Sequence, residues 1–209
     1  MASSFGYGQQ TPYDGTAPLN EVIFIIRQML ARMNTMKVVK VLAVHNVGGV
    51  SVAGTVDVQP LVSQIDGNGN PQPHGTISGV QYFRLQGGAA AIICDPAVGD
   101  VGFLVCADRD GTRIKTGQST TVDPGSSRRN DLQDGVYIGG IINATPTSYV
   151  SLNSDSSISI VDASGNKIVT SALGLTLSDS TGNQIQMRTG FVNIVTPVFQ
   201  VNGVPVTIP

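Results

Sequence analysis

The chain has 209 residues, of which 12% are charged, and its formal net charge is −2 at pH 7. The charged residues are scattered along the sequence, so the pattern predicts no basic surface for nucleic acid or an anionic membrane. The composition includes 25 glycines and no tryptophan, which is typical of short strands and tight turns. We therefore expect an all-β protein with one N-terminal helix.

Residues 1–18, MASSFGYGQQTPYDGTAP, lack the basic start and the apolar centre of a signal peptide, and we expect a flexible N-terminal arm. Over residues 19–35, apolar side chains recur at helical spacing and predict an amphipathic helix. The apolar positions of this helix are Leu19, Val22, Ile23, Ile26, Met29, Leu30 and Met33. Two interpretations stay open: the helix packs on the chain's own domain, or it docks on a partner.

Residues 36–148 are rich in short apolar runs separated by turns. The predicted strands are residues 37–44, 51–65, 79–86, 89–94, 101–108 and 135–142. Five or six such strands with one longer loop favour a small closed antiparallel barrel of the OB type. A sandwich built from the same strands has the same sequence pattern and remains an alternative.

The two cysteines lie in apolar runs that predict a hairpin of residues 89–94 with residues 101–106. In a symmetric hairpin Cys94 and Cys106 do not face each other, so a disulfide is not expected. We expect two free buried thiols, which is typical of synthesis in a reducing cytoplasm.

Residues 149–209 contain a repeat: VDASGNKI at Val161–Ile168 returns as SDSTGNQI at Ser178–Ile185. The repeat predicts a strand–turn–strand unit that is used twice. Apolar positions expected to share one face are Ile158, Ile160, Leu175, Leu177 and Ile185. So short a segment does not cover its own apolar face, which predicts a trimeric intertwined β-prism or β-helix spike, each strand pairing with strands of neighbouring chains.

Four motifs follow one another in the barrel region: VQPL at Val58–Leu61, YFRLQG at Tyr82–Gly87, DPAVGDVG at Asp95–Gly102 and RD at Arg109–Asp110. In this order they resemble the N-terminal OB-fold domain of central baseplate spike proteins from contractile-tailed bacteriophages. The resemblance covers residues 19–145. The later residues resemble the trimeric β-spike of that family more loosely, through the repeat and its position after the barrel.

This resemblance implies a structural protein of the virion, made in the host cytoplasm and placed at the tip of the tail baseplate. It implies a homotrimer whose barrel end docks on the baseplate hub protein. The spike would contact the host outer membrane transiently and puncture it mechanically during contraction.

The family's self-forming apex carries a His-x-His pair that holds iron, whereas the two histidines here are His45 and His74 in the barrel region. The resemblance therefore implies no metal tip in this chain, and a separate tip protein at Val201–Pro209.

The sequence contains no HExxH, CxxC, GxSxG or P-loop motif, so we expect no enzymatic activity, no cofactor and no metal site. His74 is expected to be a polar turn residue. The segment DGNGNP at Asp66–Pro71 partly matches a calcium loop. However, Pro71 and Ile77 occupy the positions that need glycine and a bidentate carboxylate, so we expect a flexible surface loop.

Two alternative functions stay open. An OB barrel can bind single-stranded nucleic acid, but between Met36 and Tyr149 basic and acidic residues nearly balance and most aromatic residues lie in apolar runs. No nucleic acid partner is therefore expected. A trimeric glycan-binding adhesin is the second alternative. The thin C-terminal repeat, with Phe191 and Phe199 as its aromatic residues, is unlike a broad receptor-binding domain.

Overall fold

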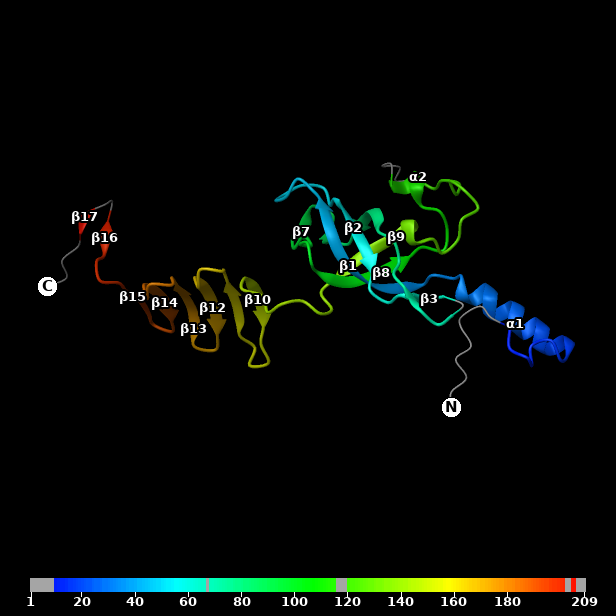
Figure 1. Cartoon of the computed structure of the whole chain (residues 1–209). Helices are drawn as coiled ribbons and strands as arrows, with labels where there is room; N and C mark the ends of the chain where they lie inside the picture. Colours follow the sequence, from blue (N-terminus) through cyan, green and yellow to red (C-terminus); the bar gives the residue numbers. More distant parts are fainter. Residues whose placement is uncertain (1–9, 67, 116–119, 202–203, 206–209) are drawn as a thin grey trace. The chain divides into compact units, whose positions relative to one another are not determined.

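The computed structural model of the chain describes residues 10–66, 68–115, 120–201 and 204–205. The chain divides into two compact units, Met1–Asn143 and Ala144–Pro209, and strands dominate both of them (Figure 1). The all-β prediction is confirmed at this level. Two predictions lie partly outside the described residues. These are the N-terminal arm, for residues 1–9, and the expected tip contact, for its last four residues, 206–209.

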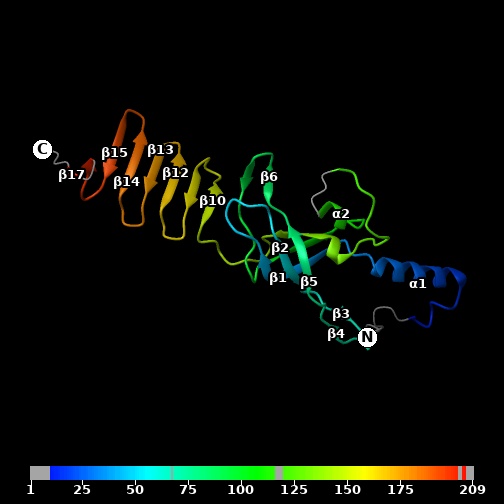
Figure 2. The same ribbon diagram turned by 90° about the horizontal axis from the view of Figure 1, so that it is seen from above.

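The first unit begins with helix α1, Pro18–Ala31, which is shorter than the predicted 19–35. Proline is well tolerated as the first helical residue because the N–H it lacks has no partner there. None of the residues of α1 is buried, and Figures 1 and 2 show it extending away from the strands of the barrel. The hypothesis that the helix packs on its own domain is therefore wrong.

Five strands close into a barrel in the order β1-β2-β5-β9-β8. Their bounds are Met36–His45 for β1, Thr55–Pro60 for β2, Ile77–Tyr82 for β5, Val101–Cys106 for β8 and Gly135–Gly139 for β9. A closed five-stranded barrel was one of the two architectures expected, and it excludes the sandwich. The expectation of a fully antiparallel barrel is wrong at one seam, because β9 enters beside β5 in the parallel direction.

The core of the barrel is made by strand residues that alternate inward and outward. In β2 the buried positions alternate strictly, with Val56 and Val58 fully buried between half-exposed neighbours. This is the pattern of a strand with one face in a core and one toward solvent. The buried apolar residues are Val39, Val41, Val56, Val58, Ile77, Val80, Tyr82, Leu104 and Tyr137.

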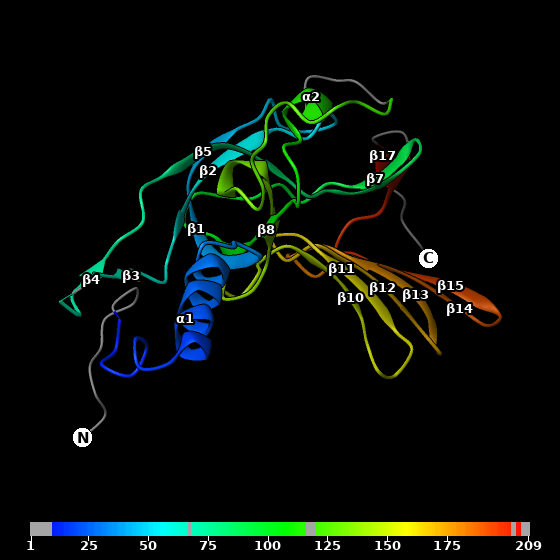
Figure 3. The ribbon, with the colours of Figure 1, turned by 90° about the vertical axis from the view of Figure 1, so that its right-hand side faces the viewer.

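Several small elements lie outside the barrel. Strands β3, Gln64–Ile65, and β4, Pro71–Gln72, form a hairpin that projects from it in Figures 2 and 3. A four-residue helix α2, Thr112–Lys115, and a 3-10 turn, Leu132–Asp134, lie between β8 and β9. The predicted strand 51–65 is thus two shorter strands, since Leu61, Val62 and Ser63 leave the sheet between them.

The predicted hairpin between residues 89–94 and 101–106 is wrong. Strand β7, Ala90–Ile92, pairs with β6, Leu85–Gly87, whereas β8 pairs with β1 and β9. A tight turn at Gly88 and Ala89 lets β6 and β7 pair with each other before the chain reaches β8. Both cysteines are free, but Cys94 is exposed, and only Cys106 is half-buried, where burial raises the pKa of its thiol.

The second unit is a six-stranded antiparallel meander, in which every strand pairs with the next one along the chain (Figure 2). Its strands are β10 Tyr149–Leu152, β11 Ile158–Val161, β12 Lys167–Ser171, β13 Gly174–Ser178, β14 Gln184–Arg188 and β15 Phe191–Val195. A small hairpin of β16, Gln200–Val201, and β17, Val204–Pro205, follows. These six strands find their partners within one chain, so the expectation that they pair with strands of other chains is wrong.

Gly102 is one of the barrel glycines whose surroundings leave no room for a side chain. A Cβ on Gly102 of β8 would lie 2.4 Å from the backbone oxygen of Ile138 and 2.6 Å from the ring of Tyr137. We expect Gly102→Ala to lower the free energy of unfolding of the barrel by about 1–3 kcal/mol, the typical cost of overpacking a core. Chemical denaturation followed by circular dichroism measures this change.

Gly87→Ala is the matched control, because Gly87 is also a strand residue but has no atom within 4 Å of the added Cβ. We expect this variant to unfold at the same denaturant concentration as the wild type. Equal destabilisation by both substitutions would contradict the close approach at Gly102.

Candidate assembly interface

One face of the six-stranded sheet is apolar along its whole length. The strand register places two rows of side chains on this face, since residues that pair directly and residues two apart point to the same side. The first row is Val150, Ile160, Ile168, Leu177, Ile185 and Ile194, and the second row is Leu152, Ile158, Thr170, Leu175, Met187 and Val192. We call these twelve residues the apolar face.

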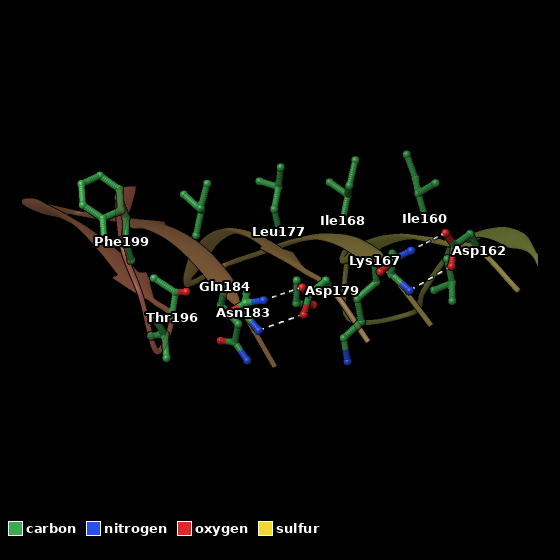
Figure 4. A pocket seen from close by; sticks show the side chains of 16 residues that line it. Ile160, Asp162, Lys167, Ile168, Leu177, Asp179, Asn183, Gln184, Thr196 and Phe199 are labelled. Atoms are coloured by element: carbon green, nitrogen blue, oxygen red, sulfur yellow. Dashed lines mark hydrogen bonds between the residues drawn. The ribbon is translucent and has the colours of Figure 1, made fainter. Parts of the chain in front are cut away.

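The apolar face carries no charge and stands open to solvent in the single chain. Its isoleucines are exposed by 40–46%, and Leu152 by 80%. The nearest basic residue, Lys167, precedes Ile168 in β12 and points to the opposite side of the sheet, as Figure 4 shows. Adjacent residues of a strand alternate between the two faces, so the same alternation keeps every charged strand residue off the apolar face.

A groove of about 640 Å³ runs along the first row of the apolar face. In Figure 4, Ile160, Ile168 and Leu177 point from successive strands to the same side, and Phe199 lies beyond the end of the row. The walls of the groove are aliphatic, with polar turn residues at its edge. The aliphatic walls suit apolar side chains, while Asp162, Lys167 and Asp179 also line the groove.

The repeat found in the sequence forms two turns with the same hydrogen bonds. In the first, Asp162 Oδ1 accepts from the backbone N–H groups of Ser164 and Asn166, both at 2.9 Å. In the second, Asp179 Oδ1 accepts from those of Thr181 and Asn183, both at 2.9 Å. The prediction of one turn used twice is confirmed.

Glycine is required in both turns, since Gly165 has φ +88° and Gly182 has φ +100°, a left-handed conformation that side chains disfavour. The two turns are also tied together: Asn166 Oδ1 accepts from the backbone N–H of Ser180 at 3.1 Å. The repeat therefore fixes the register of β11 to β14, and with it the alignment of the apolar rows.

The segment Asp66–Pro71 forms a third turn of this kind. Asp66 Oδ1 accepts from the backbone N–H groups of Asn68 and Asn70, at 2.9 and 2.8 Å. The turn joins β3 to β4, so it is a hydrogen-bonded hairpin turn and not the loose loop we expected. Its carboxylate is occupied by backbone donors, as in the two turns of the sheet.

The histidines lie apart from the apolar face. His74 Nδ1 is 3.3 Å from Gln64 Nε2, and burial together with the nearby Lys37 lowers its pKa. His45 Nε2 is 3.2 Å from Asp57 Oδ2. Within the described residues, no three His, Cys, Asp or Glu side chains are grouped so that they could hold a metal ion. Neither α1 nor α2 has the length and apolar content of a membrane-crossing helix.

The acidic residues of the barrel motifs serve the fold. Asp95 pairs with the buried Arg84 at 2.6 Å, and Asp100 Oδ2 accepts from the backbone N–H of Ala97. Asp110 accepts from the backbone N–H and the hydroxyl of Thr112, which holds the pKa of this carboxyl well below its usual range. These contacts fasten loops to the barrel and give each of the three carboxylates a partner in the fold.

The sequence pattern predicted five of the twelve residues of the apolar face. Ile158, Ile160, Leu175, Leu177 and Ile185 share one face, as predicted. The other seven include Ile168 and Ile194. Their place on the apolar face can be assigned only when the turns have set the strand register. Ser178 is the last residue of β13, beside the second turn, and its buried hydroxyl has no partner within the described part of the chain.

We compared the sequence with protein-family models and with curated proteins. No protein-family model matches the chain, and no curated protein matches it. The apolar face, the repeated turns and the exposed helix α1 are therefore the features from which the function has to be inferred.

The hydrogen bonds of the second turn lower the pKa of Asp179, which can be tested by titration. Donors from Asn183 and Thr181 lower the pKa of Asp179 to about 2 from the usual 3.8. A lowered pKa means that the ionised carboxylate favours the folded turn, so this contribution is complete above pH 3.8 and is lost as the pH falls through about 2. A carboxyl ¹³C titration by NMR should give a midpoint near 2 for Asp179.

The variant Asn183→Ala removes the first of these donors, and it should move the Asp179 midpoint up toward 3.8. A midpoint at 3.8 already in the wild type would show that the turn does not hold the carboxylate.

Proposed function

We propose that the chain is the central spike of a contractile phage tail baseplate, a homotrimer that pierces the host outer membrane mechanically. The observation that carries this proposal is the apolar face, a long uncharged surface that one chain leaves open. The five-stranded barrel and the repeat that follows it agree with what the sequence resemblance implies.

The dimensions of the sheet favour three copies. Four of the six strands have five residues, which at about 3.4 Å per residue gives a length of about 17 Å. Three sheets of that width around a threefold axis form a triangular prism whose faces lie about 5 Å from the axis. This is half of the roughly 10 Å at which packed sheets are separated, so one layer of side chains from each sheet fills the prism.

The absence of charge on the apolar face is needed in such a prism. Around a threefold axis each residue meets its own copies, so any charged side chain there would face two like charges. The apolar face has eleven aliphatic or thioether side chains and Thr170, and Lys167 and Arg188 lie on the outer face. The charged residues of the strands thus lie on the outer face, and the inner face has none.

A prism of this kind suits a mechanical role. Its strands lie across the axis and stack along it at about 4.8 Å, so six strands give a rod roughly 25 Å long. Axial load then presses on hydrogen-bonded strands and a packed core in every chain. The barrel would dock on the baseplate hub, and a separate tip protein would extend the rod beyond the C-terminus.

Leu177→Asp tests the inward face. Leu177 pairs with Ile168 and Ile185 in the middle of the first row, so the substitution would bring three carboxylates together in a dry core. Burying unpaired like charges costs several kcal/mol per ion, and we expect the trimer to be lost. The measurement is the trimer band on an SDS gel, for samples kept unheated and for samples incubated at increasing temperatures before loading.

The matched control is Thr176→Asp, one residue away in β13 and on the opposite face, where its partners are Val169 and Gln186. We expect this variant to keep the trimer at the temperatures that the wild type withstands. Equal tolerance of both substitutions, or equal loss, would mean that the apolar face is not the inner face.

The place in the virion needs a separate experiment. In electron micrographs of tails that carry the chain with an N-terminal epitope tag, gold-labelled antibody should lie at the distal end of the baseplate, on the tail axis. Label along the tube or on peripheral fibres would contradict the proposed function, whatever the oligomeric state.

A further inference from the structure

We infer that helix α1 forms a second trimer contact, a parallel three-helix bundle of α1 from three copies of the chain. This inference rests on the proposed homotrimer and names an interface outside the apolar face. It concerns six residues of α1, Leu19, Val22, Ile23, Ile26, Met29 and Leu30, together with Met33 just beyond its C-terminal end, which we call the helix stripe.

In the part of the chain that the structure describes, no element covers the helix stripe. Its side chains are exposed by 37% to 68%, and none of the residues of α1 is buried. A helix of 14 residues is marginal in water without tertiary packing, because its nucleation is unfavourable and its length short. The stripe therefore needs a partner for α1 to persist.

The spacing of the stripe fits other helices. Leu19, Val22, Ile26, Met29 and Met33 alternate at intervals of three and four residues, the repeat of helices that pack lengthwise on one another. Ile23 and Leu30 widen this seam on one side. A seam of three positions in seven is typical of helices in a bundle and is wider than a two-stranded coiled coil requires.

The charges of α1 lie away from the seam. Glu21 and Arg27 fall on the other side of the helix, and Arg32 follows its last residue. In a parallel bundle around a threefold axis, identical positions face each other, so an uncharged seam is the condition for close packing. The helix stripe satisfies this condition as the apolar face of the sheet does.

The area of the stripe is large enough to contribute to a stable trimer. Full burial of an aliphatic side chain removes roughly 60–120 Å² of apolar surface from water. At the observed exposures the seven side chains offer roughly 230–460 Å² per helix, and three helices roughly 700–1,400 Å². Specific interfaces bury about 1,200–2,000 Å², so the bundle reaches the lower part of that range and the apolar face adds to it.

Single cysteines test the bundle in the full chain. The exposed Cys94 is first replaced by serine, and Cys106, half-buried with a raised pKa, is kept and its background measured. Ile26→Cys and, separately, Met29→Cys place a thiol in the seam. On mild oxidation, a non-reducing gel should show cross-linked pairs for both, and only two of the three chains can pair at one threefold axis.

Arg27→Cys is the control, because Arg27 is exposed and lies beside the seam position Ile26 but outside the stripe. It should stay uncross-linked under the same conditions. If the protein is a trimer in solution and neither seam variant cross-links, or if Arg27→Cys cross-links equally, the bundle is wrong and the proposed spike stands. If the protein is a monomer, the proposed function fails as well.

Discussion

The structure depends on one constraint: within the described residues, nothing covers the apolar face of the six-stranded sheet. A sheet with one apolar face is stable when that face packs on another layer. The barrel meets this requirement by closing on itself around Val39, Val56, Val80 and Tyr137, while the meander does not. The same chain thus contains one unit with an internal core and one unit whose apolar face stays exposed.

The repeated turns explain how so simple a sequence specifies that surface. Strands of four or five residues with alternating apolar and polar side chains have a weakly defined register, and a slip of one residue would exchange the two faces. Asp162 and Asp179 close identical turns, and Asn166 links one turn to the next. The polar residues of the repeat therefore decide to which side of the sheet the apolar residues point.

The sequence predicted those features that local patterns determine. The alternation in TVDVQP, the repeat at Asp162 and Asp179 and the shared face of Ile158 to Ile185 are all properties of single strands and turns, and the structure shows them. Pairing between distant strands could not be predicted in the same way: β8 pairs with β1 and β9 instead of β7, and β9 joins β5 in parallel. The strand pairing within the meander also differs from the intertwined arrangement we expected, because hairpin turns as short as Ser171–Gly174 favour the next strand of the same chain.

The central claim is that the apolar face is buried between three copies of the chain. Its most direct test is the mass of the full-length protein in solution, measured by light scattering after size-exclusion chromatography at micromolar concentration. The account predicts one species at three times the chain mass of 21.7 kDa, with no dissociation on dilution. A monomer, or a dimer that pairs two sheets face to face, would contradict it.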